Sequence, residues 1–200
     1  MVLMDENTRQ AWERFLNPDI LRANLIGAST YVAAYELLRD TIIERIRDFY
    51  LIEADADGMT NDTEYRSDVL SMNRSPVYAS LQWFKQSGAI NDDDILAFER
   101  IKECRNTIAH EMDKILDGGL PPSFSDCFNE LVSLLSKIER WWIVNIEIPI
   151  TSDSVKGNIN AADVIPGRIL LIQMLFDIAL GSEDASKFYL NKLVRHTGGV

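Results

Sequence analysis

The chain has 200 residues, a length that suits a single domain, and a chain of this size can bury enough surface to fold without a metal or disulfide. Hydrophobic residues make up 46% and charged residues 26%, which are ordinary globular values, and only ten glycines and six prolines argue against a turn-rich β-sandwich or barrel. The formal net charge of −11 disfavours a wide, sequence-indifferent nucleic-acid groove, because such grooves bind through many Lys and Arg contacts to phosphate.

Most of the chain is predicted to be helical. In chain order, the predicted helices cover Asp5–Leu16, Asp19–Ile52, Glu64–Met72, Ser75–Ser87, Asn91–Leu116, Phe124–Asn145, Gly167–Leu180 and Ser182–Arg195. Asn17 can cap the second of these helices, and Asn91 can cap the fifth, where three aspartates follow in the first turn. Ile146–Ile150 is expected to form a short extended piece. The sequence therefore predicts an all-α fold.

The longest predicted helix carries an apolar stripe that should pack against neighbouring helices, in its own bundle or across a dimer. The stripe consists of Leu21, Leu25, Ala28, Val32, Tyr35, Leu38, Ile42, Ile46 and Phe49. Trp141 and Trp142 end a second strong stripe. One of these two rings is expected in the core and the other at a dimer or partner contact, which fits better than a base-stacking platform because few basic residues surround the pair.

Several features bear on cellular location. Met1–Asn7 lacks a basic region followed by an apolar core, so no signal peptide is expected. Apolar runs such as Ile169–Ile172 are far too short to cross a membrane. Cys104 and Cys127 form no Cys-x-x-Cys pair, and Cys104 falls on a predicted apolar helix face, where a small buried thiol is expected. We expect a reducing, cytoplasmic setting and no membrane partner.

The candidate catalytic residues lie in the segment Arg105-Asn106-Thr107-Ile108-Ala109-His110. A guanidinium matches phosphate oxygens in a fixed fork, and an imidazole titrates near neutral pH. With the amide of Asn106, these groups can hold a phosphate, orient it and move a proton. That set is the minimum for metal-free RNA cleavage.

The position of these residues around the predicted helix tests the idea. Cys104, Ile108, Met112 and Ile115 lie within about 60° of Ile101 and form an apolar face. His110 lies at about 180° and Asn106 at about 140° from Ile101, so both sit opposite the core, whereas Arg105 at about 40° lies at the edge of the apolar face. A straight helix does not bring the three together, so catalysis would require a bend or a second chain.

Arg105, Asn106 and His110 resemble the Arg-x4–6-His signature of the HEPN superfamily (higher eukaryotes and prokaryotes nucleotide-binding), in whose ribonuclease members the residue after the arginine is often asparagine. The resemblance implies a single all-α, HEPN-like helical bundle over residues 1–200. Its core would cover about 19–145, and a C-terminal helical extension would cover about 160–196.

The resemblance also implies a function, a metal-independent endoribonuclease in which two copies bring their motif helices into one composite site. His110 would be the acid or base for attack by the 2′-hydroxyl, Arg105 the phosphate clamp and Asn106 the group that orients them. It further implies RNA as the substrate, no cofactor, a toxin or anti-phage role, and an antitoxin or other regulatory protein as a partner. Met112 stands where one group of toxins in this superfamily carries a modified tyrosine, so control by that modification is not expected.

Two other functions fit parts of the sequence. A non-catalytic HEPN-like dimerisation or adaptor module fits the position of Arg105 and the eight acidic against four basic residues from Asp92 to Asp117. Calcium binding is suggested by Glu53–Glu64, which resembles a twelve-residue EF-hand loop but has Glu first and Thr60 eighth, so a solvated acidic loop is the simpler interpretation. His196 falls in an expected frayed tail, and no zinc spacing, glycine-rich phosphate loop or Gly-x-Ser-x-Gly turn is present.

Overall fold

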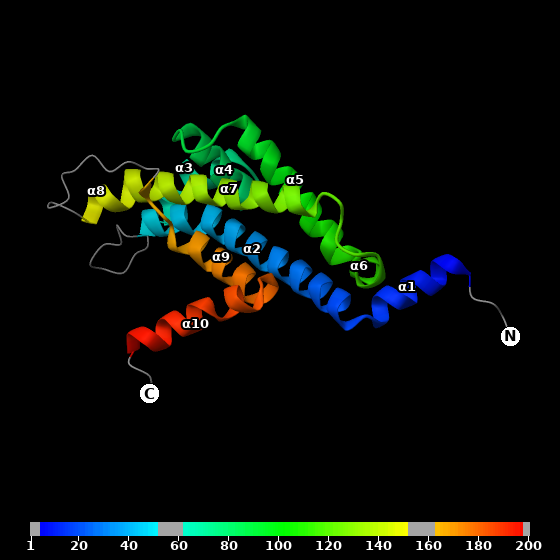
Figure 1. Ribbon diagram of the computed structural model, residues 1–200. Helices are drawn as coiled ribbons and strands as arrows, with labels where there is room; N and C mark the ends of the chain where they lie inside the picture. Colours follow the sequence, from blue (N-terminus) through cyan, green and yellow to red (C-terminus); the bar gives the residue numbers. More distant parts are fainter. Residues whose placement is uncertain (1–4, 52–61, 152–162, 198–200) are drawn as a thin grey trace.

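The computed structural model describes residues 5–51, 62–151 and 163–197, and these three ranges form an assembly of helices (Figure 1). The helices are α1 (Glu6–Leu16), α2 (Pro18–Leu51), α3 (Asp62–Asp68), α4 (Pro76–Gln86), α5 (Asp92–His110), α6 (Met112–Gly118), α7 (Phe124–Trp142), α8 (Ile148–Thr151), α9 (Gly167–Leu180) and α10 (Glu183–Thr197). No strand occurs within those ranges, so the predicted all-α class is confirmed. None of the described helices combines the length and apolar character needed to span a membrane.

Helices α2 and α5 begin at the caps that the sequence predicts. The Asn17 side chain accepts a hydrogen bond from the backbone N–H of Asp19 at 3.0 Å, and Pro18 opens α2. At α5, the Asn91 side chain accepts from the Asp94 N–H at 3.0 Å while the Asp94 carboxylate accepts from the Asn91 N–H at 2.8 Å. Each such cap contributes about 1 kcal/mol to helix stability, so local sequence suffices to set these two starts.

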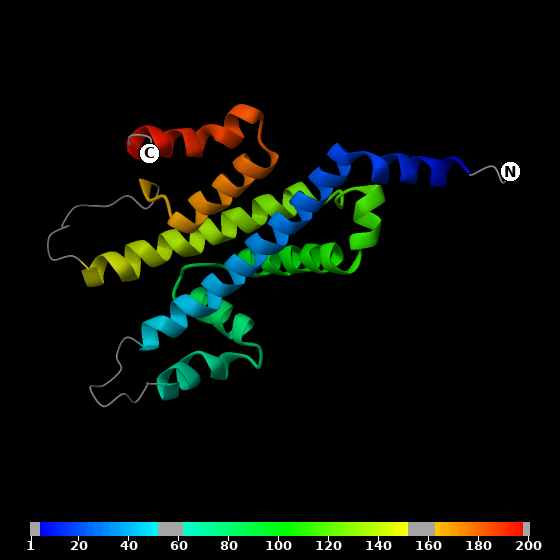
Figure 2. The ribbon, with the colours of Figure 1, turned by 90° about the horizontal axis from the view of Figure 1, so that it is seen from below.

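Helix α2 runs through the middle of the molecule and contacts α4, α5, α7 and α9 (Figure 2). Helices α5 and α7 pack along one another. Both views place α5 and α9 on opposite sides of the α2–α7 pair, while α1 and α6 pack together at one end. Helix α10 folds back from α9 and projects away from the bundle (Figure 2).

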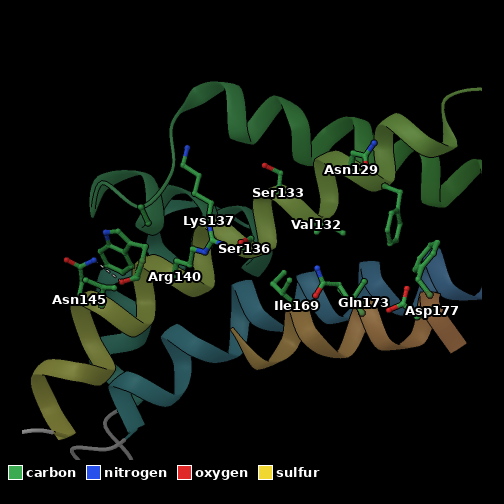
Figure 3. Close-up of a pocket in the computed structure, with 16 residues that line it drawn as sticks. Asn129, Val132, Ser133, Ser136, Lys137, Arg140, Asn145, Ile169, Gln173 and Asp177 are labelled. Carbon is green, nitrogen blue, oxygen red and sulfur yellow. Dashed lines mark hydrogen bonds between the residues drawn. The ribbon is translucent and has the colours of Figure 1, made fainter. Parts of the chain in front are cut away.

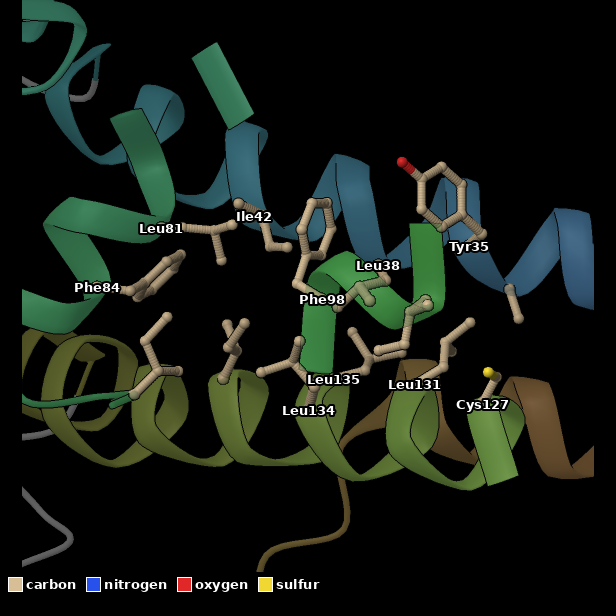
Figure 4. Packing of buried hydrophobic residues seen from close by; sticks show 14 of the residues in the cluster. Tyr35, Leu38, Ile42, Leu81, Phe84, Phe98, Cys127, Leu131, Leu134 and Leu135 are labelled. Atoms are coloured by element: carbon tan, nitrogen blue, oxygen red, sulfur yellow. The ribbon is translucent and has the colours of Figure 1, made fainter. Parts of the chain in front are cut away.

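The apolar core lies where α2, α4, α5 and α7 meet (Figure 4). Its fully buried side chains include Tyr31, Leu38, Ile42, Leu81, Phe84, Phe98, Ile101, Leu131 and Leu135. Most of the predicted α2 stripe is buried or half-buried, but Leu25 is 40% exposed, so that part of the prediction is wrong. Tyr31 was not predicted in the stripe, yet it is fully buried and its hydroxyl donates to the Ile101 carbonyl at 3.0 Å.

Two local predictions are wrong, and a third falls mostly outside the described residues. Residues 146–150 are helical rather than extended, because a wider helical segment over Ile143–Glu147 continues α7 into α8. That path lets Glu147 form an ion pair with Arg45 of α2 at 2.5 Å. The β-branched residues of this segment do not by themselves indicate that contact. His196 belongs to the last turn of α10 instead of a frayed tail. Most of the EF-hand-like segment, residues 53–61, lies outside the described residues.

Of the tryptophan pair, the ring of Trp142 is buried and that of Trp141 is half-buried, so the expected core ring is confirmed. Trp142 packs edge-on against Phe49 of α2, with ring centroids 6.1 Å apart. Trp141 packs edge-on against Trp83 and Phe84 of α4. The pair therefore joins α7 to both α2 and α4, and such aromatic contacts add to the stability that burial alone provides.

Glu139 of α7 is a buried charge, with a side chain only 1% exposed. Its carboxylate accepts two hydrogen bonds from Arg45 of α2, at 2.8 and 3.2 Å, and lies 3.5 Å from the Arg168 guanidinium of α9. Arg168 also donates to the Thr41 hydroxyl of α2. This network joins three helices, and a buried carboxylate is tolerated because both its oxygens are paired.

Removing that carboxylate should destabilise the protein strongly. We expect Glu139→Ala to lower the free energy of unfolding by about 3 kcal/mol or more, because it leaves Arg45 half-buried without its main partner. Glu130→Ala is the control on the same helix, since Glu130 pairs with Arg100 at 2.7 Å on the surface and should cost below about 1 kcal/mol. Urea denaturation measures the free energy of unfolding of both variants. Equal losses in the two would contradict the claim that the buried ion pair stabilises the protein more than the surface pair does.

The two thiols provide a second test. Cys104 and Cys127 are both buried, as expected for Cys104, and burial raises the pKa of the Cys104 thiol to about 11. The thiolate is the reactive form, so at pH 8 the folded protein has about a hundredfold less Cys104 thiolate than an ordinary cysteine would. We expect Ellman's reagent to react slowly with the native protein and to titrate both thiols rapidly in denaturant. Rapid reaction of both thiols in the native state would contradict this packing.

Candidate functional site

The predicted helix over Asn91–Leu116 is interrupted beside the motif histidine. Helix α5 ends at His110, Glu111 has φ −114° and ψ 29°, and α6 starts at Met112 in a new direction (Figure 2). The sequence has neither glycine nor proline at the interruption, and its helical periodicity runs on to Leu116. The prediction of a single long helix is therefore wrong, and the chain bends immediately after His110.

Packing at the end of the molecule explains the bend. Helix α6 turns onto α1 and α2, where Ile115 is only 2% exposed. Asn24 of α2 is itself buried, and its side-chain N–H donates to the Ile115 carbonyl at 3.0 Å. Apolar burial and a satisfied buried amide outweigh the few tenths of a kcal/mol per residue that favour an uninterrupted helix.

His110 is exposed in the last turn of α5. Within the described ranges, its imidazole makes no hydrogen bond or ion pair. This confirms that it lies off the apolar face of α5. An imidazole so placed is accessible to a large ligand and free to exchange a proton.

Arg105 points instead towards α2. Its Nη2 lies 3.0 Å from Glu36 Oε1, and its guanidinium carbon is 5.4 Å from the ring centre of Tyr35. Its Nη1 donates to the Asn106 side-chain oxygen at 3.4 Å, while its Nε is buried with no partner among the described residues. Arg105 therefore helps hold α5 against α2 and retains one unused N–H.

Lys102 is a candidate that sequence reasoning missed. Lys102, Asn106 and His110 follow one another at steps of four residues, so they form a stripe on one side of α5. The Lys102 ammonium donates to the Tyr78 hydroxyl of α4 at 2.6 Å. The four-residue spacing was visible in the sequence, but no motif drew attention to it.

Two tyrosine hydroxyls border this part of α5. Burial raises the pKa of Tyr35, with the nearby Arg105 charge opposing the rise. Burial also raises the pKa of Tyr78, with a further contribution from its hydrogen bond to Glu99. Both hydroxyls are therefore neutral at physiological pH, so neither adds negative charge beside the two cations.

A groove of about 1150 Å³ lies on the other side of the bundle, between α7 and α9 (Figure 3). Val132, Ser136, Arg140, Ile169, Gln173 and Asp177 are among its lining residues, and none of the motif residues reaches it. Its two cations already have partners, because Lys137 pairs with Asp94 and Arg140 Nε donates to the Val164 carbonyl at 3.1 Å. The groove is therefore a poorer candidate for phosphate chemistry than the end of α5.

Comparison with known proteins adds no assignment. No model of a known protein family matches the sequence, and neither a curated protein nor a solved structure matches the chain significantly. The likeness to the HEPN superfamily therefore rests on Arg105, Asn106 and His110 and on the helical setting of these residues.

The different surroundings of Arg105 and His110 predict different effects on stability. Arg105→Ala removes a partly exposed ion pair and a contact with Tyr35, so we expect a loss of about 1–2 kcal/mol in unfolding free energy. His110→Ala should change it by less than about 0.5 kcal/mol, because the side chain is exposed. Thermal and urea denaturation measure both variants. A large loss in the His110 variant would contradict the exposed position.

Proposed function

We propose that the protein is a metal-independent endoribonuclease of the HEPN type that works as a homodimer. His110 is the acid or base, Arg105 binds the phosphate and Asn106 orients them. The observation that supports this proposal best is the exposed His110 at the bend between α5 and α6, with Asn106 one turn away on the same side. A bend or a second chain is what the motif requires, because Arg105 faces α2.

Phosphate binding is compatible with the contacts of Arg105. The Arg105 side chain is 32% exposed, and its Nε–H is buried with no partner among the described residues. A phosphate can take the place of the Glu36 carboxylate, because a planar carboxylate and a tetrahedral phosphate both accept hydrogen bonds from the guanidinium fork. Lys102, with its ammonium on the stripe that leads to Asn106 and His110, is a second cation for the RNA backbone.

A surface for a second copy lies at the same end of the molecule. Helix α6 follows directly after His110 and packs against α1. On α1, Trp12 is 50% and Leu16 is 69% exposed. Large exposed apolar residues of this kind favour association. Two copies that meet through α1 and α6 would bring their α5 ends near each other and make the composite site.

Cleavage of labelled RNA in the presence of EDTA tests the proposal. We expect the parent protein to cut and His110→Ala to cut at least about a hundredfold more slowly, because an acid–base group contributes about that factor or more. Arg105→Ala should also be strongly impaired. His196→Ala is the matched control, since His196 is the other histidine and lies exposed on α10, a helix that Figure 1 shows on the opposite side of α2 from α5.

Equal cleavage by the parent and the His110 variant, or no cleavage by either, would contradict the ribonuclease proposal. A toxin or anti-phage role makes a further claim about cells. Expression of the parent should slow bacterial growth or block phage multiplication, His110→Ala should remove the effect, and an antitoxin or regulatory partner should restore growth.

A non-catalytic dimerisation or adaptor module is the second candidate. It is favoured by the contacts that tie Arg105 to Glu36 and Tyr35, which give the arginine a structural role independent of RNA. On this alternative, the His110 variant should dimerise and bind partners as the parent does, and neither should cut RNA.

A further inference from the structure

Helix α9 is apolar on two opposite sides. Its inner side packs on the bundle through Ile169, Ile172 and Phe176. Its outer side carries a stripe of four residues at helical spacing, and we call these the outer stripe: Leu171, Met174, Leu175 and Ile178. Leu171 is 48%, Leu175 is 42% and Ile178 is 49% exposed, although a helix that is apolar all round is normally covered.

Helix α10 does not cover the outer stripe. It packs against α9, yet Phe188 is 53% and Leu190 is 63% exposed. Figure 2 shows α9 lying along the α2–α7 pair and α10 projecting away from it. Large apolar side chains left exposed on both helices favour a protein contact.

Charge indicates which partner suits this surface. Residues 167–197 contain four basic and three acidic residues, a balance of +1, whereas the whole chain carries −11. Two copies of a strongly acidic protein repel each other least where the local charge is near zero. The outer stripe itself contains no charged side chain, so two such stripes meet without any like-charge contact.

The charges of α10 are arranged by sign along the helix. Glu183 and Asp184 lie in its first turn, where Glu183 pairs with Lys187 at 2.5 Å, and Arg195 and His196 lie in its last turn. When two copies of this helix run antiparallel, the acidic end of each faces the basic end of the other. The arrangement is therefore complementary to itself under a two-fold axis, as an isologous interface requires.

We propose that the outer stripe binds the outer stripe of a second copy of this chain, so that two α9–α10 hairpins form a four-helix arrangement. In the antiparallel pairing, Leu171 of one copy lies opposite Ile178 of the other, and Met174 lies opposite Leu175. Apolar residues at this spacing on facing helices interdigitate as in other helical bundles.

This interface is separate from the proposed ribonuclease site and does not depend on it. Helices α5 and α9 lie on opposite sides of the α2–α7 pair (Figure 1), so pairing through α9 leaves α5, the helix that carries His110, on the far side of each copy from the contact. Loss of RNA cleavage in the His110 variant would leave the interface unaffected. Conversely, loss of this interface would not test the chemistry of the motif.

The test is the mass of the full-length protein in solution, measured by light scattering and by sedimentation. We expect the double variant Leu175→Glu, Ile178→Glu to have a lower mass than the parent at equal concentration, because it places four carboxylates in the contact between two copies. Leu96→Glu is the control, since Leu96 is 57% exposed on α5 and lies outside the hairpin. Circular dichroism shows that each variant is folded.

Charge reversal tests the antiparallel arrangement with milder changes. Asp184→Lys and Arg195→Glu should each weaken self-association severalfold, and the two together should restore it. A parent that is monomeric at all concentrations would overturn the proposal, as would a double stripe variant that keeps the mass of the parent. Failure of the combined charge variant to recover would overturn the antiparallel pairing.

Discussion

A single carboxylate, buried between two guanidinium groups, sets the arrangement of three helices. Glu139 of α7 lies in the interior, where Arg45 of α2 pairs with both its oxygens and Arg168 of α9 lies beside it. A shift of any of these helices by one turn, about 5.4 Å, would leave a buried charge unpaired. The position of α9 follows from this constraint, and with it the direction in which the outer stripe faces.

On the opposite side of α2, a second set of contacts positions the candidate site. The Tyr31 hydroxyl bonds to Ile101, and Arg105 is held by Glu36 and the Tyr35 ring. These contacts hold α5 against α2 at Ile101 and Arg105, and the helix continues to an exposed His110, immediately before the bend at Glu111. The arginine thus serves two purposes on our proposal, because the same guanidinium that stabilises α5 would receive the phosphate of an RNA. On that proposal, phosphate and Glu36 would compete for the guanidinium, and the strength of the ion pair would affect RNA cleavage.

The two proposed contacts between copies use different parts of the chain. A composite ribonuclease site calls for association near α1, α6 and the end of α5, whereas the hairpin of α9 and α10 faces the other way. Surfaces on opposite sides of one subunit build assemblies larger than a dimer. The acidic remainder of the molecule limits association to such near-neutral apolar surfaces, because like charges repel elsewhere.

Local patterns in the sequence were enough to predict the all-α class, the caps at Asn17 and Asn91, the buried Cys104 and the position of His110 off the apolar face, since each depends on residues within a few turns of one helix. The break at Glu111, the helical path over residues 146–150 and the direction of Arg105 were decided by tertiary structure. In each case a partner distant in the chain outweighs local preference: Asn24 holds Ile115, Arg45 holds Glu147, and Glu36 holds Arg105. Helical periodicity reports which side of a helix is apolar, but it contains no information about which distant side chain will meet it, so the motif residues could be found in the sequence and their mutual geometry could not.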